Sequence, residues 1–410
     1  ILMTLVGCAG VPDKDEKGTA VIVDVKELAK SADAETLTDI SPEVMYLLLT
    51  AEVAGQRNKY GVALDGYLEA AKRVGDVRIA ERAAKIGLFL KNTKKTTEAV
   101  SLWIKQDGNN LTARKIAALS ALKEGDEALA IEHLNKMLET DPAGFEGSLL
   151  ELTRILIKDN KKKVGFILNV LDRVADQHPE QATVFFVQAL LAGQVKNTEL
   201  AIAKVNKVLE LQPDWDRALI LRAQASVQNK AFDQAIDDLE KVIEHSPDNN
   251  KIRKMLGQVL MKTDALDDAV GVYEKVLENI PDDGESQFAI ALIYLQQKKE
   301  QEAQDYLKKL VNKRGWDAQA SFYMGRIDYK NEQYERALTW FDKVTQGPYG
   351  YDAAMAAVSV LSEQKNFIEA EERIAKLIER FPKRKVNILL LQAEVFSAQK
   401  KYQQTFWLLG

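Results

Sequence analysis

The sequence predicts an all-α fold of stacked antiparallel helix pairs, an α-solenoid. Three observations predict it: prolines recur with a period of 34, small residues keep fixed distances from them, and apolar residues between them follow helical spacing. The prolines that carry the period are Pro142, Pro179, Pro213, Pro247, Pro281, Pro348 and Pro382. The one long interval, 67 residues after Pro281, contains Gly315-Trp316 where a mark is missing.

Small residues mark both helices of each predicted pair. Twelve residues before successive marks stand Ala201, Ala235, Ala269 and Ala303, and twenty-four before them stand Ala189, Ala223, Gly257 and Ala291. Gly325 and Ala337 keep the same order with a slip of one residue. Small residues allow two helix backbones to approach closely. Since proline cannot continue a helix but suits its first turn, each proline separates one pair from the next.

Composition excludes several classes of function. The chain is 46% hydrophobic, which is enough to bury a large core. With 56 basic against 61 acidic residues, it has no basic excess to neutralise nucleic-acid phosphates. One Cys and three His supply neither a disulfide framework nor a standard zinc site. We expect no nucleic acid, metal, cofactor or small-molecule substrate.

Residues 1–8 are a short apolar run that ends at Cys8, and they are too short to cross a bilayer. Leu5-Val6-Gly7-Cys8 resembles the bacterial lipobox, whose cysteine is acylated, so residues 1–8 are expected to be the remnant of a lipoprotein signal peptide. Two or three acyl chains form a lasting membrane anchor. The alternative is a buried apolar strand with an incidental cysteine.

In such signals, Ala9 after the cysteine implies sorting to the outer membrane of a Gram-negative cell. Residues 9–40 are mostly small and polar around one apolar patch, Val21-Ile22-Val23, and are expected to form a tether. We therefore expect a lipid-anchored protein that faces the periplasm.

The 34-residue pattern from residue 41 onward resembles the tetratricopeptide repeat (TPR) family. The resemblance implies a right-handed superhelix of about eleven helix-turn-helix repeats, with the first helix of each pair lining a concave channel. Residues 41–178 are divergent repeats, with Ile155 and Ile167 where small residues belong. Residues 179–410 are regular repeats, and we expect the last to be truncated at Gly410.

No catalytic residue is predicted, because the chain lacks a phosphate-binding loop, a nucleophile elbow and a dinucleotide fingerprint. Three histidines are expected near the ends of second helices of different repeats, where a cation favours the helix dipole: His133, His178 and His245. The pair Asp237-Asp238 is expected to be solvated. An enzyme would require a catalytic domain beyond Gly410.

Partner-binding residues are predicted from first-helix positions at fixed steps from the small residue. Their mixture of aromatic, amide, Met and Arg side chains suits a bound helix or extended peptide. The predicted residues are Phe186, Ile220, Lys254, Gln258, Phe288, Leu292, Phe322, Arg326, Tyr329 and Met355. The alternative is that several of the aromatic residues pack against the neighbouring repeat and never meet a ligand.

The layout of lipobox, tether and repeats, together with residues 41–49 and 51–57, resembles a group of gammaproteobacterial lipoproteins. The characterised member of that group partners a periplasmic carboxyl-terminal processing protease. The resemblance implies a non-catalytic adaptor that activates this protease and presents protein substrates, among them cell-wall hydrolases. Two alternatives stay open: a regulator of a peptidoglycan synthase, and a pilotin or assembly factor for an outer-membrane complex.

Overall fold

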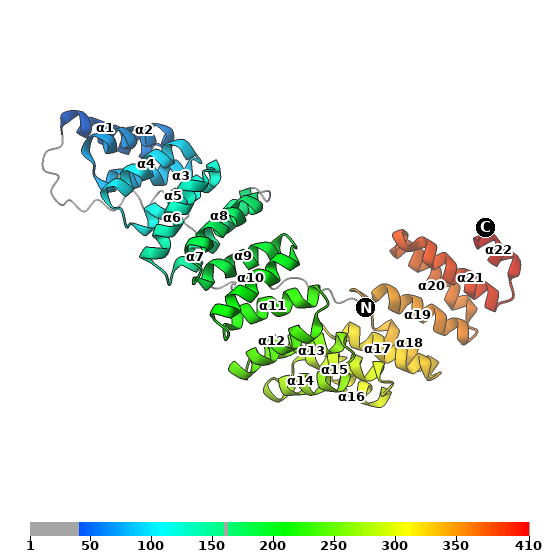
Figure 1. Cartoon of the computed structure of the whole chain (residues 1–410). Coiled ribbons are helices and arrows are strands. Elements are labelled where there is room, and N and C mark those ends of the chain that lie inside the picture. Colours follow the sequence, from blue (N-terminus) through cyan, green and yellow to red (C-terminus); the bar gives the residue numbers. More distant parts are fainter. Residues whose placement is uncertain (1–40, 160–162, 410) are drawn as a thin grey trace. The chain divides into compact units, whose positions relative to one another are not determined.

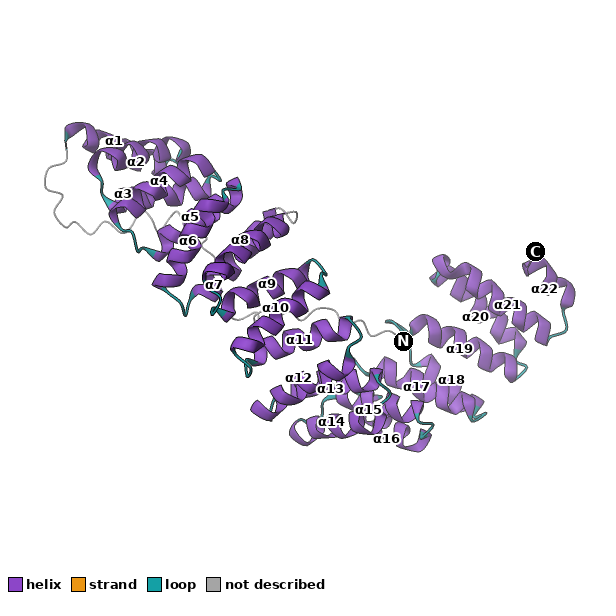
Figure 2. Ribbon diagram, in the orientation of Figure 1, coloured by secondary structure: helices purple, strands orange, loops and turns teal. Residues whose placement is uncertain are grey.

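The computed structural model describes residues 41–159 and 163–409, which form helices and connecting turns without a strand (Figure 2). The predicted all-α class is confirmed. The chain divides into two units, Ile1–Ala231 and Phe232–Gly410. This boundary lies inside the regular repeats, whereas the regularity of the sequence changes near residue 178. Cys8 and the predicted tether lie outside the described residues.

In the described part of the first unit, helices adjacent in sequence pack together: α1 on α2, α3 on α4, α5 on α6 and α9 on α10 (Figure 1). The helices are α1 (Pro42–Gln56), α2 (Tyr60–Val74), α3 (Val77–Phe89), α4 (Thr93–Gln106), α5 (Leu111–Glu124), α6 (Glu127–Thr140), α7 (Phe145–Asp159), α8 (Val164–Gln177), α9 (Ala182–Gln194), α10 (Thr198–Leu211) and α11 (Asp216–Gln228).

The second unit repeats this arrangement, with α13 on α14, α15 on α16, α17 on α18, α19 on α20 and α21 on α22. Its helices are α12 (Phe232–His245), α13 (Asn250–Lys262), α14 (Leu266–Asn279), α15 (Gly284–Gln296), α16 (Glu300–Leu310), α17 (Asp317–Lys330), α18 (Tyr334–Asp342), α19 (Gly350–Glu363), α20 (Phe367–Arg380), the 3₁₀ turn η2 (Pro382–Arg384), α21 (Lys385–Ala398) and α22 (Tyr402–Leu409).

The two helices of a pair are joined by a short turn with one residue in the left-handed conformation. In the turn after α15, Lys298 has a φ of +62°, and the Lys299 amide donates a hydrogen bond to the Tyr294 carbonyl. This arrangement satisfies carbonyls at the helix end that have no partner within the helix. The same conformation recurs at Asn58, Lys91, Lys196, Asp264, Glu332, Lys365 and Lys400.

Each proline mark lies in the connection from one pair to the next, as predicted. Pro281 stands between the last residue of α14 and the start of α15. The next helix is then capped by Asp283, whose carboxylate accepts a hydrogen bond from the Ser286 amide at 2.8 Å. Proline and cap together stop one helix and start another within a few residues.

The predicted small residues lie where two helices of a pair approach. Ala269, Ala291 and Ala303 are fully buried. At Gly257 and Gly325 the approach is closer still, because a Cβ built on either glycine would lie 2.7 Å from a ring of the second helix, Tyr273 or Phe341. Hydrogen is therefore the side chain that these two contacts accept.

Gly325→Ala should lower the free energy of unfolding by about 1–2 kcal/mol, because the steric conflict with Phe341 exceeds the gain in helix propensity. Gly271→Ala is the matched control: it lies within α14 with open space around its Cβ position, so it should raise stability by about 1 kcal/mol. Urea unfolding followed by circular dichroism measures both. A stabilising Gly325→Ala would refute the close packing.

Candidate functional site

The predicted partner-binding residues all lie on first helices, from α9 to α19. The structure separates them by accessibility. One set, the covered row, consists of Phe186, Phe288 and Phe322, and its members are buried. A second set, the open row of the second unit, consists of Gln258, Leu292, Arg326 and Ser359, one per repeat and half-buried or exposed.

The covered row corrects the expectation that these three phenylalanines project into an open channel. Phe186 and Phe288 are each 2% exposed, and Phe322 is 8% exposed. The alternative interpretation, that the aromatic residues pack against the neighbouring repeat, agrees with this burial. A partner cannot contact these rings without displacing other side chains.

Each covered phenylalanine lies against an aromatic ring near the entry of the next repeat. The ring centroids of Phe186 and Trp215 are 4.7 Å apart. Those of Phe288 and Trp316 are 5.6 Å apart, and those of Phe322 and Tyr349 are 5.1 Å apart. The sequence signal that was missed is an aromatic residue 29, 28 and 27 positions after the respective phenylalanine.

In the repeat between these aromatic pairs, the equivalent residue is Lys254, and acids cover it instead. Its Nζ lies 2.7 Å from a Glu285 carboxylate oxygen and 3.2 Å from an Asp283 one. Gln258 Nε2 also donates to Glu285, at 3.3 Å. Burial opposes the charge of Lys254, but the bonds to Glu285 and Asp283 outweigh it and raise the Lys254 pKa. The ammonium group is thus neutralised within the chain.

The remaining predicted residues are more accessible. Ile220, Leu292, Tyr329 and Met355 are half-buried, and Arg326 is exposed. Leu292 and Tyr329 pack at the edge of the apolar cluster that contains Phe288 and Phe322. These side chains can contact a partner and still contribute to the core.

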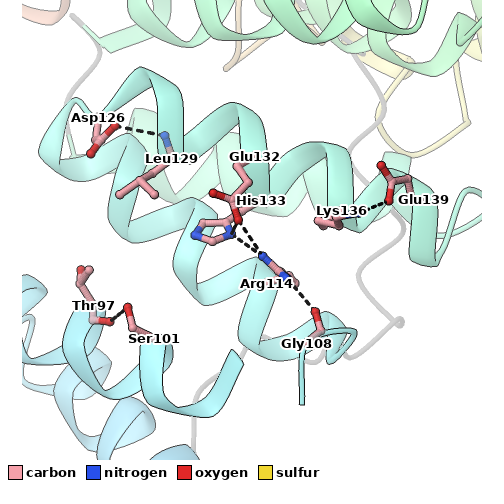
Figure 3. A network of polar contacts seen from close by, with 10 residues as sticks. All are labelled: Thr97, Ser101, Gly108, Arg114, Asp126, Leu129, Glu132, His133, Lys136 and Glu139. Carbon is pink, nitrogen blue, oxygen red and sulfur yellow. Dashed lines mark hydrogen bonds and ion pairs between the residues drawn. The ribbon is translucent and has the colours of Figure 1, made fainter. Parts of the chain in front are cut away.

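A buried polar network in the first unit joins α5 to α6 (Figure 3). Arg114 Nε donates to the Gly108 carbonyl at 2.9 Å, and its Nη1 lies 3.0 Å from His133 Nδ1 and 3.2 Å from Glu132 Oε1. Because arginine can only donate, Nδ1 accepts and the imidazole is neutral. Burial lowers the pKa of His133, Arg114 lowers it further, and Glu132 opposes both.

Two expectations about charged residues need correction. His133 lies in the middle of α6, not near its end, so the helix dipole does not account for its position. Asp238 is fully buried and not solvated, and it accepts a hydrogen bond from Gln234 at 3.1 Å. In residues 41–159 and 163–409, no group of His, Cys, Asp or Glu is arranged to hold a metal ion.

Phe322→Ala should lower the free energy of unfolding by about 3 kcal/mol, because it removes a buried ring that touches Tyr323 and Tyr349. Ile368→Ala is the control: this residue is 79% exposed on α20 and should change stability by less than about 0.5 kcal/mol. Equal effects in urea unfolding would contradict the burial of the covered row.

Stability should fall as the pH drops through about 6.5, since the unfolded chain protonates His133 before the folded chain does. The loss continues until the pH passes the lower pKa of the folded state. His133→Gln keeps an acceptor for Arg114 without this titration, so its unfolding free energy should decline less over the same range. Identical pH profiles of the two proteins would count against the neutral imidazole.

Comparison with known proteins agrees with this architecture. A family profile described as tetratricopeptide repeat matches residues 226–293, and one described as anaphase-promoting complex, cyclosome, subunit 3 matches residues 262–344. The chain is 27% identical over 195 residues to the TPR repeat-containing protein PA4667 of Pseudomonas aeruginosa, a match that covers 47% of this chain and 32% of the relative. The chain thus spans about a third of the length of this curated relative.

Similar solved structures include YrrB, described as a TPR protein with an unusual peptide-binding site, at 22% identity with a TM-score of 0.38. It covers 48% of this chain and 97% of its own. The pilF protein of Pseudomonas aeruginosa is 20% identical with a TM-score of 0.39, over 49% and 92% of the two chains. The helix pairs and the matched repeat profile lead to one conclusion: this chain is an all-α protein built from tetratricopeptide repeats.

Proposed function

We propose that this protein is a non-catalytic adaptor that binds another protein through its first helices. The observation that carries the proposal is the open row, which presents amide, aliphatic, guanidinium and hydroxyl groups at one position of successive repeats. Such a surface recognises a chain that extends over several repeats, with apolar anchors and polar groups that set its register.

The finer proposal names the partner and the location. The resemblance of Leu5-Val6-Gly7-Cys8 to a lipobox and of residues 41–57 to a lipoprotein group supports an outer-membrane lipoprotein that faces the periplasm. None of the helices in the described ranges is both long and apolar enough to cross a membrane. The proposed partner is a carboxyl-terminal processing protease, with cell-wall hydrolases as the presented substrates.

Such an adaptor needs no chemistry of its own. By holding protease and substrate on one scaffold, it raises their effective concentration for each other. It activates the protease only if it binds the active conformation more tightly than the inactive one. Both effects depend on the first-helix surface and not on a catalytic group of this chain.

The test measures cleavage of a cell-wall hydrolase by the purified protease with and without the full chain. We expect faster cleavage with the chain, and weaker protease binding, by about tenfold, for Leu292→Asp on the open row. Ile368→Asp introduces the same charge at an exposed aliphatic residue of a second helix and should behave as the wild type. Circular dichroism controls for loss of fold.

Affinity capture from cross-linked membranes complements this assay. Recovery of the protease with hydrolases supports the proposed partner. An unchanged cleavage rate, together with recovery of a peptidoglycan synthase or a secretin and no protease, would overturn the partner while leaving the adaptor role. If Leu292→Asp and Ile368→Asp bind equally, the open row is not the binding surface.

A further inference from the structure

Helix α17 exposes very little of its surface, and Arg326 occupies the opening. From Ala320 to Asp328 every residue of this helix is buried except Arg326. The neighbouring members of the open row in the described residues are uncharged: Gln258, Leu292 and Ser359. Arg326 is therefore a single positive charge within a row of neutral side chains.

The guanidinium of Arg326 lies over two aromatic rings of its own helix. Its Cζ is 6.0 Å from the centroid of Phe322 and 5.8 Å from that of Tyr323. Cation–π attraction restrains the side chain, while the N–H groups at the edge of the planar guanidinium stay available to a ligand. Because Phe322 and Tyr323 are buried, the surface beneath the guanidinium is rigid.

Other first-helix cations of this unit are already matched by acids. Lys254 is held by Glu285 and Asp283, and Lys330 pairs with Glu300. Within residues 41–159 and 163–409, Arg326 makes no hydrogen bond or ion pair; its interactions are the two ring contacts. A restrained arginine without an acid partner is suited to bind one from outside, in a bidentate manner.

The surroundings of Arg326 are apolar and partly accessible. Leu292, Trp316, Tyr329 and Tyr349 are half-buried members of the cluster that contains Phe322 and Tyr323. A ligand that places a carboxylate on Arg326 would therefore meet apolar side chains beside it. This combination selects a carboxylate that neighbours an aliphatic or aromatic side chain.

We propose that Arg326 binds a carboxylate of the partner protein, in an extended segment that carries an apolar side chain next to that carboxylate. This inference rests on the proposed function, namely that the first helices bind a protein. The carboxylate can come from the C-terminus of the partner or from an Asp or Glu side chain. The two sources share the same chemistry at Arg326 and differ in what amidation of the terminus does.

Fluorescence anisotropy with the full chain and three labelled octapeptides tests the proposal. The first ends in Leu-Phe with a free carboxylate, the second is its C-terminal amide, and the third is an amide with an internal Asp-Phe pair. The wild type should bind the first or the third peptide at least tenfold more tightly than the second, since a charge-assisted bidentate contact is worth about that factor or more.

Arg326→Gln should abolish this preference, and Arg326→Lys should retain part of it, because lysine keeps the charge but not the planar fork. Lys241→Gln removes one charge from the exposed surface of α12 and should bind as the wild type does. Unfolding midpoints should be unchanged in all three variants, because the substituted residues are exposed. A preference for the first peptide identifies a chain terminus as the ligand, and one for the third identifies a side chain.

The proposal is overturned if none of the peptides binds the wild type more tightly than it binds Arg326→Gln. Its failure can be told apart from failure of the adaptor function with the protease itself. If Arg326→Gln binds the protease as the wild type does, the adaptor role stands and the role of Arg326 is refuted. If the wild type does not bind the protease, the proposed partner fails, and the peptide data still decide the role of Arg326.

Discussion

The close approach of the two helices within each pair is the contact on which the rest of this structure depends. It occurs where a glycine or alanine of the first helix meets the second helix, as Gly325 meets Phe341. A larger side chain would separate the backbones and shift every later pair, because in a repeat array each unit is packed only against its neighbours. The left-handed turns and the proline connections serve this contact, since they start and stop helices at the positions that keep the small residues in register.

This packing also decides what the surface can present. First helices lie between their own second helix and the neighbouring repeats, so little of each remains accessible. In the second unit the accessible position carries Gln258, Leu292, Arg326 and Ser359. The covered row lies on the same helices, but rings from the entry of the next repeat close over it. Binding specificity must therefore arise from a small number of side chains, and a single exposed charge among them has a large effect.

Charge is treated differently at neighbouring first helices. Lys254 is matched by Glu285 and Asp283, which ties one repeat to the next, whereas Arg326 is held by rings and keeps its hydrogen-bond donors. In the first unit Arg114 is buried and holds His133 in its neutral form, which makes that contact sensitive to pH. The same type of group thus serves as an internal link, as a free donor or as a titratable contact, according to what the adjacent element places beside it.

The sequence by itself determined the helix pairs, their connections and the small residues at their crossings, because these features depend on local chemistry that repeats with a period of 34. It also identified Leu292, Arg326 and Tyr329 as accessible first-helix residues. Only the tertiary structure decided that Phe186, Phe288 and Phe322 are covered, that Lys254 is neutralised and that Asp238 is buried. The physical reason is that periodicity gives the direction of a side chain around its own helix, while burial depends on residues about 30 positions away that the stacking of repeats brings over it.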